Sequence, residues 1–262
     1  MPSDPKWPKD SFYLSLTSSV VGAIRAAATP KDIEGLMESI AREMGFRYYA
    51  LIHHDNLMTC GYERVDIKDY PPAITDRLFA QNCYRRDPVI RGCIFADSAF
   101  LWSDLPRIVH FDRRDRASFE FGAREGLNEG ITVPYVRLGD RMGSCTFAGM
   151  RWPERAHVFL GAAQMIGIFA FQSARQLICG KLPIVTSSAR LHPRPRDCVI
   201  LAGRGYSNKQ IARVLSLTPR TVDGYLTEAR RLFEAHDRTE LVVSAVLAGE
   251  IGLDELRSRQ PE

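Results

Sequence analysis

Residues 205–233 decide the fold of this chain, and they read GYSNKQIARVLSLTPRTVDGYLTEARRLF. Ser207 stands at an N-cap position before a helix whose apolar residues recur at three- and four-residue spacing. After a short turn, Thr218 is expected to cap a second helix. Pro219 then takes its first position, where proline is tolerated because that N–H has no partner inside the helix. Two helices joined by a tight turn indicate a helix-turn-helix.

The second helix of this pair is predicted to have two distinct faces. Its inner face is expected to be apolar and to contain Val222, Tyr225, Leu226, Ala229 and Leu232. The outward residues nearest to the base edges of a bound duplex are predicted to be Arg220, Thr221, Asp223, Gly224 and Thr227. Contacts to phosphate are predicted for four basic residues, Lys209, Arg213, Arg230 and Arg231.

Charge favours double-stranded DNA as the partner of this region. From Arg190 to Arg231 there are nine Lys or Arg against three acids, a net charge of +6, whereas all 262 residues together carry +4. A local basic excess of this kind attracts phosphate. The alternative is a solvated helical bundle without a role in DNA binding. A helix near 239–248, opened by a capping box of Asp237 and Glu240, could pair two copies of this domain.

The N-terminal part alternates helix and strand patterns. Residues 31–44 show the spacing of an amphipathic helix, and Phe46, Tyr48, Ala50 and Ile52 alternate with their neighbours as in a strand. Two further strands are predicted over 130–138 and 143–150, joined by a hairpin turn near Gly139 and Asp140. These patterns predict an α+β fold, an α-β-α sandwich around a largely antiparallel sheet that encloses a small-molecule cavity, followed by a small all-α domain.

The boundary between the two parts follows a change of composition. We expect a long apolar helix over 154–178 that serves the core or also a dimer interface, and that is too interrupted by polar residues to cross a bilayer. The proline- and serine-containing stretch after it is typical of a linker. The predicted organisation is a ligand-binding and dimerisation domain over 1–180, a linker over 181–190 and a DNA-binding domain over 191–262.

Composition and motifs exclude several other classes of function. With 45% hydrophobic and 25% charged residues, the chain is expected to be neither disordered nor a multi-pass membrane protein. The six cysteines contain no Cys-x-x-Cys pair, and His53-His54 has no third ligand at metal spacing, so neither a metal nor a cofactor is predicted. No paired acid and base indicates an enzyme. Scattered thiols without a leader favour the cytoplasm. The run 113–116 is interpreted as a solvated helix turn.

The segment from Arg194 to Phe233 resembles the C-terminal domain of LuxR-type transcriptional regulators. The matching residues are Gly205, Ser207, Ile211, Ala212, Thr221 and Val222. One departure concerns the first helix of this domain, where the family usually has a Glu and this chain has Pro195. We therefore expect that helix to begin at or after Pro195.

The segment from Tyr70 to Asp104 resembles the acyl-homoserine-lactone binding region of quorum-sensing receptors, so the resemblance covers nearly the whole chain. The residues that carry it are Tyr70-Pro71, Asp87-Pro88-Val89, Trp102, Gly126, Gly130 and Pro134. The resemblance also places Ser144 and Thr146 on the strand where the family has a hydroxyl near the acyl chain. It implies that Asp87 accepts a hydrogen bond from a ligand amide, that Tyr70 donates to the amide carbonyl and that Trp102 closes the pocket. Alternatively, Asp87 only caps a turn beside Pro88.

The same register exposes departures from the family. Ile74 stands where the family has the Trp that donates to the lactone carbonyl, Leu78 replaces a ligand-facing Tyr, and Cys83 replaces a third, commonly aromatic residue. An unmet buried acceptor costs about 1–3 kcal/mol. Either water or another side chain replaces the lost donor, or the ligand has no lactone, or the pocket is closed and the protein works without ligand.

Together these features predict a transcriptional regulator of the quorum-sensing type. It is expected to act as a cytoplasmic homodimer on a palindromic operator and to sense an acyl-homoserine lactone or a related small amphiphile, with no membrane partner. The alternatives are a ligand-independent regulator of the same type and an inhibitory heterodimer partner of a related regulator. The second alternative arises because Asp223 and Glu228, on the recognition helix, would face phosphates.

Overall fold

The computed structural model describes residues 10–54, 63–80, 86–180 and 190–257. The chain divides into two compact units, Met1–Leu182 and Pro183–Glu262, each of which is described by itself. Residues 181–189 of the predicted linker and Cys83 lie outside the described residues.

The N-terminal unit contains a five-stranded sheet in the order β2-β1-β5-β4-β3. All neighbouring strands are antiparallel, as in the pairs Ile52↔Ser144 and Ala50↔Thr146 of β1 and β5. This confirms the predicted antiparallel sheet, although β4 ends at Tyr135, before the predicted residue 138. The strands are β1 (Phe46–His53), β2 (Asp66–Asp69), β3 (Phe100–Leu101), β4 (Gly130–Tyr135) and β5 (Gly143–Met150).

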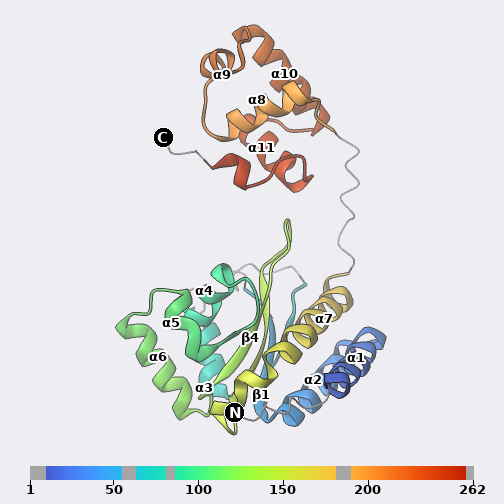
Figure 1. The fold of residues 1–262 in the computed structure, drawn as a ribbon, viewed down its shortest axis with the longest axis vertical. Helices are drawn as coiled ribbons and strands as arrows, with labels where there is room; N and C mark the ends of the chain where they lie inside the picture. Colours follow the sequence, from blue (N-terminus) through green and yellow to red (C-terminus); the bar gives the residue numbers. More distant parts are fainter. Residues whose placement is uncertain (1–9, 55–62, 81–85, 181–189, 258–262) are drawn as a thin grey trace, which may run out of the picture. The chain divides into compact units, whose positions relative to one another are not determined.

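Helices cover both faces of this sheet, so the predicted α-β-α sandwich is confirmed (Figure 1). One layer consists of α1 (Asp10–Ala26), α2 (Pro30–Met44) and α7 (Leu160–Cys179). The other layer consists of α3 (Pro72–Thr75) with the π-helical turn η1 (Asp76–Ala80), α4 (Pro88–Phe95), α5 (Leu105–Ile108) and α6 (Arg113–Arg124), and the 3-10 turn η3 (Trp102–Asp104) precedes α5.

The entry into the sheet follows from local signals in the sequence. Thr29 and Asp32 form a capping box at the start of α2, and Gly45 ends the helix with a left-handed backbone at φ 83°. The expectation that Phe46 shares a side with Tyr48 is wrong. Phe46 packs instead in the core on the other face of the sheet, under α1, α2 and α7, with its ring centroid 6.0 Å from that of Phe147.

The apolar stretch before the linker forms two elements rather than one helix. A 3-10 segment, η4 (Pro153–Phe159), leads into α7, and together they are long and apolar enough to span a membrane by length and composition alone. However, the buried face of α7, which includes Ala163, Gly167 and Phe171, packs on β4 and β5. We therefore describe α7 as a core helix.

Strand β5 separates two apolar layers because its side chains alternate between the faces of the sheet. Cys145 and Phe147 are fully buried in the core under α1, α2 and α7. Ser144 and Thr146 point the other way, toward the layer that contains Trp102 and the helices α3 to α6. Polar side chains on that second face place the candidate site there.

The C-terminal unit is all helical, as predicted. It contains α8 (Pro193–Gly203), α9 (Asn208–Leu215), α10 (Pro219–Leu232), α11 (Arg238–Leu247) and the 3-10 turn η5 (Asp254–Leu256). The predicted start of its first helix is wrong, since α8 begins at Pro193 rather than at or after Pro195. Both prolines lie in the first turn, where the backbone N–H groups have no partner inside the helix.

Two further expectations for this unit need correction. Leu232 is 43% exposed and does not belong to the inner face of α10, because it lies at the last residue of the helix. Asp237 caps α11 through the N–H groups of Thr239 and Glu240, but Glu240 accepts from the N–H of His236 instead of completing a box with Asp237.

The contact between α7 and the sheet provides a stability test. A Cβ added at Gly167 would lie 2.8 Å from Cγ2 of Val133 and 3.1 Å from Cβ of Cys145, whereas one added at Gly161, in the same helix, meets nothing within 4 Å. We predict that Gly167→Ala destabilises the N-terminal unit by about 1–3 kcal/mol through overpacking. Gly161→Ala should leave stability unchanged or raise it by up to about 1 kcal/mol.

Urea unfolding followed by tryptophan fluorescence measures this difference, because all three Trp residues precede residue 183 and report on the N-terminal unit. Equal midpoints for the two variants would contradict the tight contact at Gly167.

Candidate ligand cavity and DNA-binding surface

A cavity of about 100 Å³ lies between the sheet and the helices α3 to α6. All seven residues that sequence analysis proposed for ligand binding line it, namely Tyr70, Ile74, Leu78, Asp87, Trp102, Ser144 and Thr146. They come from separate elements, so the fold alone brings them together.

Asp87 both caps a helix and faces the cavity. Its Oδ1 accepts from the backbone N–H groups of Val89 (2.9 Å) and Ile90 (3.3 Å), at the start of α4. Its Oδ2 accepts no hydrogen bond from any residue that the structure describes. Burial raises the pKa of this carboxyl to about 6, and the nearby charge of Asp115 adds to the rise. The two N–H groups and Arg91 act in the opposite direction.

A line of hydrogen bonds runs along the cavity wall from Trp102 to Thr146. The indole N–H of Trp102 donates to Oγ1 of Thr132 at 2.9 Å, and Oγ1 of Thr132 lies 3.0 Å from Oγ1 of Thr146. Thr146 and Tyr70 both line the cavity, and Thr146 acts to lower the pKa of the Tyr70 phenol. Burial, and then the charge of Asp87, raise the pKa of the Tyr70 phenol, which therefore stays protonated and can donate. Because its N–H is occupied, Trp102 offers only its apolar ring to the cavity.

The residues that depart from the family pattern line the same cavity. Ile74 is buried, and Leu78 is partly buried one helical turn later. Neither side chain can donate a hydrogen bond. The wall on their side is consequently apolar, except for Arg77.

Four polar residues of the cavity wall were not identified as site residues from the sequence, namely His53, His54, Arg77 and Ser118. His54 was interpreted only as part of a strand-end pair, but its Nε2 lies 2.9 Å from Oγ of Ser144, and both residues line the cavity. Burial lowers the pKa of His54 to about 4, so the imidazole is neutral at pH 7. Arg77 also lines the cavity, with its guanidinium 4.5 Å from the centroid of the Phe121 ring. No motif or spacing marked His54 or Arg77.

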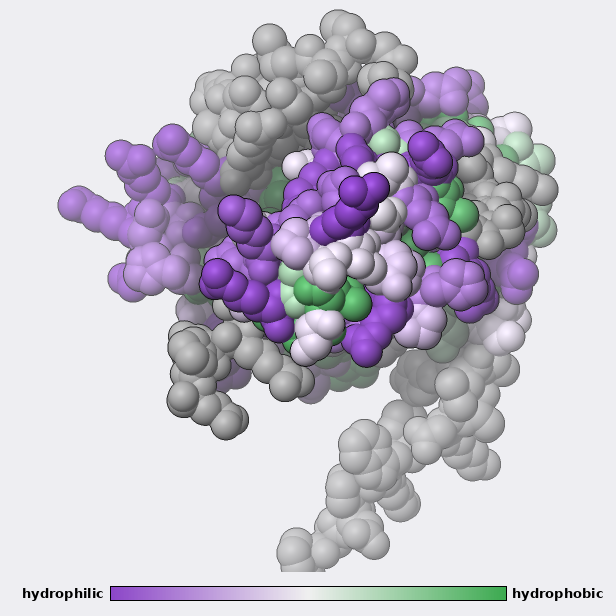
Figure 2. Space-filling model, turned by 90° about the horizontal axis from the view of Figure 1, so that it is seen from above, coloured by the Kyte–Doolittle hydropathy of each residue, from purple (hydrophilic) through white to green (hydrophobic). Residues whose placement is uncertain are grey.

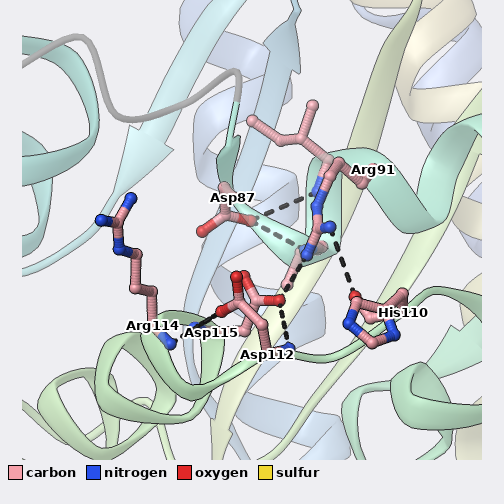
Figure 3. A network of polar contacts seen from close by, with 8 residues as sticks. Asp87, Arg91, His110, Asp112, Arg114 and Asp115 are labelled. Atoms are coloured by element: carbon pink, nitrogen blue, oxygen red, sulfur yellow. Dashed lines mark hydrogen bonds and ion pairs between the residues drawn. The ribbon is translucent and has the colours of Figure 1, made fainter.

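A polar network adjoins Asp87 and corrects a further interpretation. The run 113–116 is not simply a solvated turn, because Asp115 is only 6% exposed and pairs with Arg91 at 2.7 Å (Figure 3). Asp115 also accepts from the N–H of Asp112 at 2.9 Å, and Arg91 donates to the carbonyl of His110 at 3.3 Å. These bonds tie the start of α6 to α4.

Metal chemistry receives no support in the part of the chain that the structure describes. No group of three or more His, Cys, Asp or Glu side chains within 10–54, 63–80, 86–180 and 190–257 could hold a metal ion.

The helix-turn-helix forms as its capping residues predict. Ser207 and Gln210 make a capping box on α9, and the Thr218 side chain accepts from the N–H of Thr221 at 3.1 Å, with Pro219 at the first position of α10. The turn between the helices uses Ser216 in the left-handed region, at φ 54°. Figure 2 shows hydrophilic side chains around one small hydrophobic patch on the face in view.

The structure places the predicted DNA-contacting residues on accessible positions of α9 and α10. The exposed ones are Lys209, Arg213, Arg220, Asp223, Gly224 and Arg231, and the partly exposed ones are Thr221, Thr227 and Arg230. Arg230 donates to Oγ1 of Thr227 at 3.0 Å. A Cβ at Gly224 would meet open space, so the backbone of α10 is accessible there.

Part of the basic excess serves the fold of this unit. Arg196 donates to the Glu250 carbonyl at 2.9 Å and pairs with Glu255 at 2.6 Å, and Arg204 donates to the Glu255 carbonyl at 2.7 Å. Asp223 accepts from the Asn208 amide at 3.2 Å, and the carbonyl of that amide accepts from Arg238 at 3.0 Å. Asp223 and Arg238 thus share Asn208 as a hydrogen-bond partner.

Two family models match the chain. The model described as "Autoinducer binding domain" matches residues 29–174, and the model "Bacterial regulatory proteins, luxR family" matches residues 189–245. The quorum sensing-dependent regulator RpaR of Rhodopseudomonas palustris is 31% identical over 82% of this chain and 87% of its own length. The activator BjaR1 of Bradyrhizobium diazoefficiens is 28% identical over 67% of this chain and 71% of its own.

Solved structures support the same fold. The crystal structure of Escherichia coli SdiA has a TM-score of 0.54 at 17% identity and covers 91% of this chain and 98% of that chain. SdiA in complex with octanoyl-rac-glycerol also has a TM-score of 0.54, at 18% identity, with 92% of this chain and 97% of that chain covered.

The division of α9 and α10 into phosphate and base contacts can be tested by substitution. We predict that Lys209→Ala and Arg213→Ala each weaken binding to all DNA sequences and reduce the slope of log K against log salt by about 1. Arg220→Ala should cost about 1–3 kcal/mol and relax specificity at one base position. Fluorescence anisotropy across a salt series measures both effects. A sequence-specific loss from Arg213→Ala would reverse the two assignments.

Proposed function

Because this chain belongs to the luxR family of bacterial regulatory proteins and carries an autoinducer binding domain, we propose that its cavity binds an N-acyl-homoserine lactone or a related N-acyl amphiphile. The chain is a quorum-sensing transcriptional regulator whose C-terminal domain binds DNA, and its relatives are regulators rather than enzymes. We propose the identity of the amphiphile, the residues that anchor it and a homodimeric assembly.

The observation that carries the proposal is the free oxygen of Asp87. Oδ1 is occupied by the two N–H groups of α4, Oδ2 has no described donor, and Asp87 lines the cavity. An amide N–H of the ligand would give this oxygen a charge-assisted hydrogen bond, which is stronger than a bond between neutral groups. Tyr70, protonated and beside Asp87, would donate to the amide carbonyl. The alternative in which Asp87 only caps a turn uses one of its oxygens and leaves the other unexplained.

The rest of the wall fits an acyl chain. Ala50, Ile52, Phe119 and Leu127 line the cavity, and the ring of Trp102 adds a flat apolar surface. Burial of these surfaces against a chain contributes roughly 0.8 kcal/mol per methylene. A lactone is not needed for this fit, and SdiA, a protein with the same fold, has been solved with octanoyl-rac-glycerol.

We also propose a cytoplasmic homodimer that reads a palindromic operator. Val158 and Met165 on η4 and α7 remain exposed and can contribute to contact between two copies. In the DNA-binding domain, Val243 and Leu247 leave an apolar surface on α11 for the same purpose. A two-fold dimer would place its two α10 helices in successive major grooves of one operator.

Two substitutions at Asp87 separate its roles as helix cap and ligand anchor. Asp87→Asn keeps an oxygen for the N–H groups of Val89 and Ile90 but puts an NH₂ donor where the ligand amide needs an acceptor. We predict that it costs about 1.5–3 kcal/mol of ligand binding with little change in stability. Asp87→Ala should lose ligand binding and also about 1 kcal/mol of stability. Calorimetry with N-hexanoyl-homoserine lactone and thermal unfolding measure the two quantities.

The same anchor predicts a pH dependence. Because the carboxyl has a pKa of about 6, it must lose its proton to accept the amide, so affinity should rise about tenfold from pH 5 to pH 7. The folded pKa lies above the ordinary aspartate value of 3.8, so in the absence of ligand this group costs stability as pH rises from about 4 to 6. Asp87→Asn should flatten both profiles. An unchanged affinity profile in that variant would remove Asp87 from the site.

Selection of duplexes from a random pool tests ligand dependence and separates the three functional alternatives. The protein should come from a host that makes no acyl-homoserine lactone. We expect a palindrome to be enriched more strongly when N-acyl probes are added. Equal enrichment without probes would indicate a ligand-independent regulator, and no enrichment in either case would indicate an inhibitory heterodimer partner.

A further inference from the structure

An open cleft of about 580 Å³ adjoins the buried cavity at Asp87. Four residues, Arg77, Leu78, Asp87 and Ser118, line both spaces, so the cleft is the mouth of the cavity. A ligand whose amide meets Asp87 would therefore hold its acyl chain in the cavity and its other substituent at or in the cleft.

The cleft carries guanidinium groups that no described carboxylate neutralises. Arg77, Arg86, Arg91 and Arg114 line it. Arg91 is occupied by Asp115, but the other three form no ion pair or side-chain hydrogen bond with any residue within the described ranges. In Figure 3 the Arg114 guanidinium points away from the carboxylates of Asp112 and Asp115.

Asp112 and Asp115, two of the acids that line the cleft, already accept hydrogen bonds. Asp112 accepts from the N–H groups of Arg114 (2.7 Å) and Asp115 (2.9 Å), and Asp115 accepts from the N–H of Asp112 and from Arg91. The cleft is lined by four arginines and by three acids, Asp87, Asp112 and Asp115, so it keeps a small net positive charge that attracts an anion.

Arg77 stands at the position where recognition of a lactone is weakest. It lies between Ile74 and Leu78, the two residues that replace the polar side chains of the lactone-binding family pattern. Its guanidinium lies over the ring of Phe121 at 4.5 Å, and Phe121 lines the cavity as well. This stacking fixes a flat pair of donors at the junction of cavity and cleft.

We propose that the ligand carries a free carboxylate, as in an N-acyl amino acid or a ring-opened acyl-homoserine, and that Arg77 binds this carboxylate at the mouth of the cavity. This inference rests on the proposed function, because it places the ligand amide at Asp87. In such a ligand the carboxylate is attached to the carbon beside the amide nitrogen, so both groups reach side chains that line the same junction. In a lactone the same carbon carries a neutral ester carbonyl, which a guanidinium binds less strongly than a carboxylate.

The test compares two probes that differ only by opening of the lactone ring, which frees a carboxylate and a hydroxyl: N-hexanoyl-homoserine lactone and N-hexanoyl-homoserine. Calorimetry on the full chain at pH 7 should show that the open form binds about tenfold or more tightly than the lactone. Arg77→Gln should abolish that preference by weakening only the open form. Arg77→Lys, which keeps the charge but loses the fork, should restore part of it.

Two controls keep the result independent of folding. Arg107→Gln removes an exposed arginine of the same unit that lines neither space and pairs with Asp104, and it should change neither affinity. In the unmodified protein, added salt should weaken binding of the open form and leave that of the lactone nearly unchanged, because only the former is an ion pair.

The outcomes separate this inference from the proposed function. Suppose that the lactone binds more tightly and Arg77→Gln has no effect, while Asp87→Asn still weakens binding. The inference of a ligand carboxylate at Arg77 is then wrong, and the proposal that Asp87 anchors the ligand amide is retained. If neither probe binds, or if Asp87→Asn has no effect on either, both the amide anchor and the carboxylate site are wrong.

Discussion

Burial of the Asp87 carboxylate is the constraint on which the ligand cavity depends. A buried carboxylate must be hydrogen-bonded, and α4 satisfies one of its oxygens by beginning at this residue with two free N–H groups. The second oxygen accepts no hydrogen bond from any described residue, and Asp87 lines the cavity. Arg91, one turn into α4, lowers the cost of this arrangement, and Asp115 holds Arg91 in place. Helix start, cavity wall and polar network are therefore consequences of one buried charge.

The elements and residues that could be predicted from the sequence are those whose signals are local. Ser207 and Thr218 each precede a helix within three residues of the N–H groups they cap, so their roles were visible without tertiary structure. The hairpin turn predicted near Gly139 and Asp140 also indicated antiparallel pairing, and β4 and β5 pair in this way. The residues around the cavity were found through resemblance to a family pattern. The structure shows only that they line the same cavity.

The errors and omissions arose where tertiary contacts decide. Proline in the first turn of α8 costs no hydrogen bond, so Pro195 did not delay the helix. Asp115 stands in a charged run that the sequence analysis interpreted as a solvated turn. It is buried because it pairs with Arg91, which belongs to a different helix. His54 and Arg77 carry no motif, and only the closure of α3 and α6 over the end of β1 makes them part of a cavity wall. No periodicity of the chain contains that information.

The same buried charge explains how a ligand in the N-terminal unit can regulate DNA binding without a contact between the two units. A carboxyl with a pKa of about 6 in the folded unit, above the ordinary aspartate value of 3.8, makes the unit without ligand less stable at neutral pH. An amide donor at Oδ2 would stabilise the carboxylate only in the folded state, since the unfolded chain has no such cavity. By mass action, ligand would then raise the population of folded protein available for pairing and for DNA. Coupling between ligand binding and DNA binding thus requires only that the ligand stabilise the folded state at Asp87 and that both units belong to one chain.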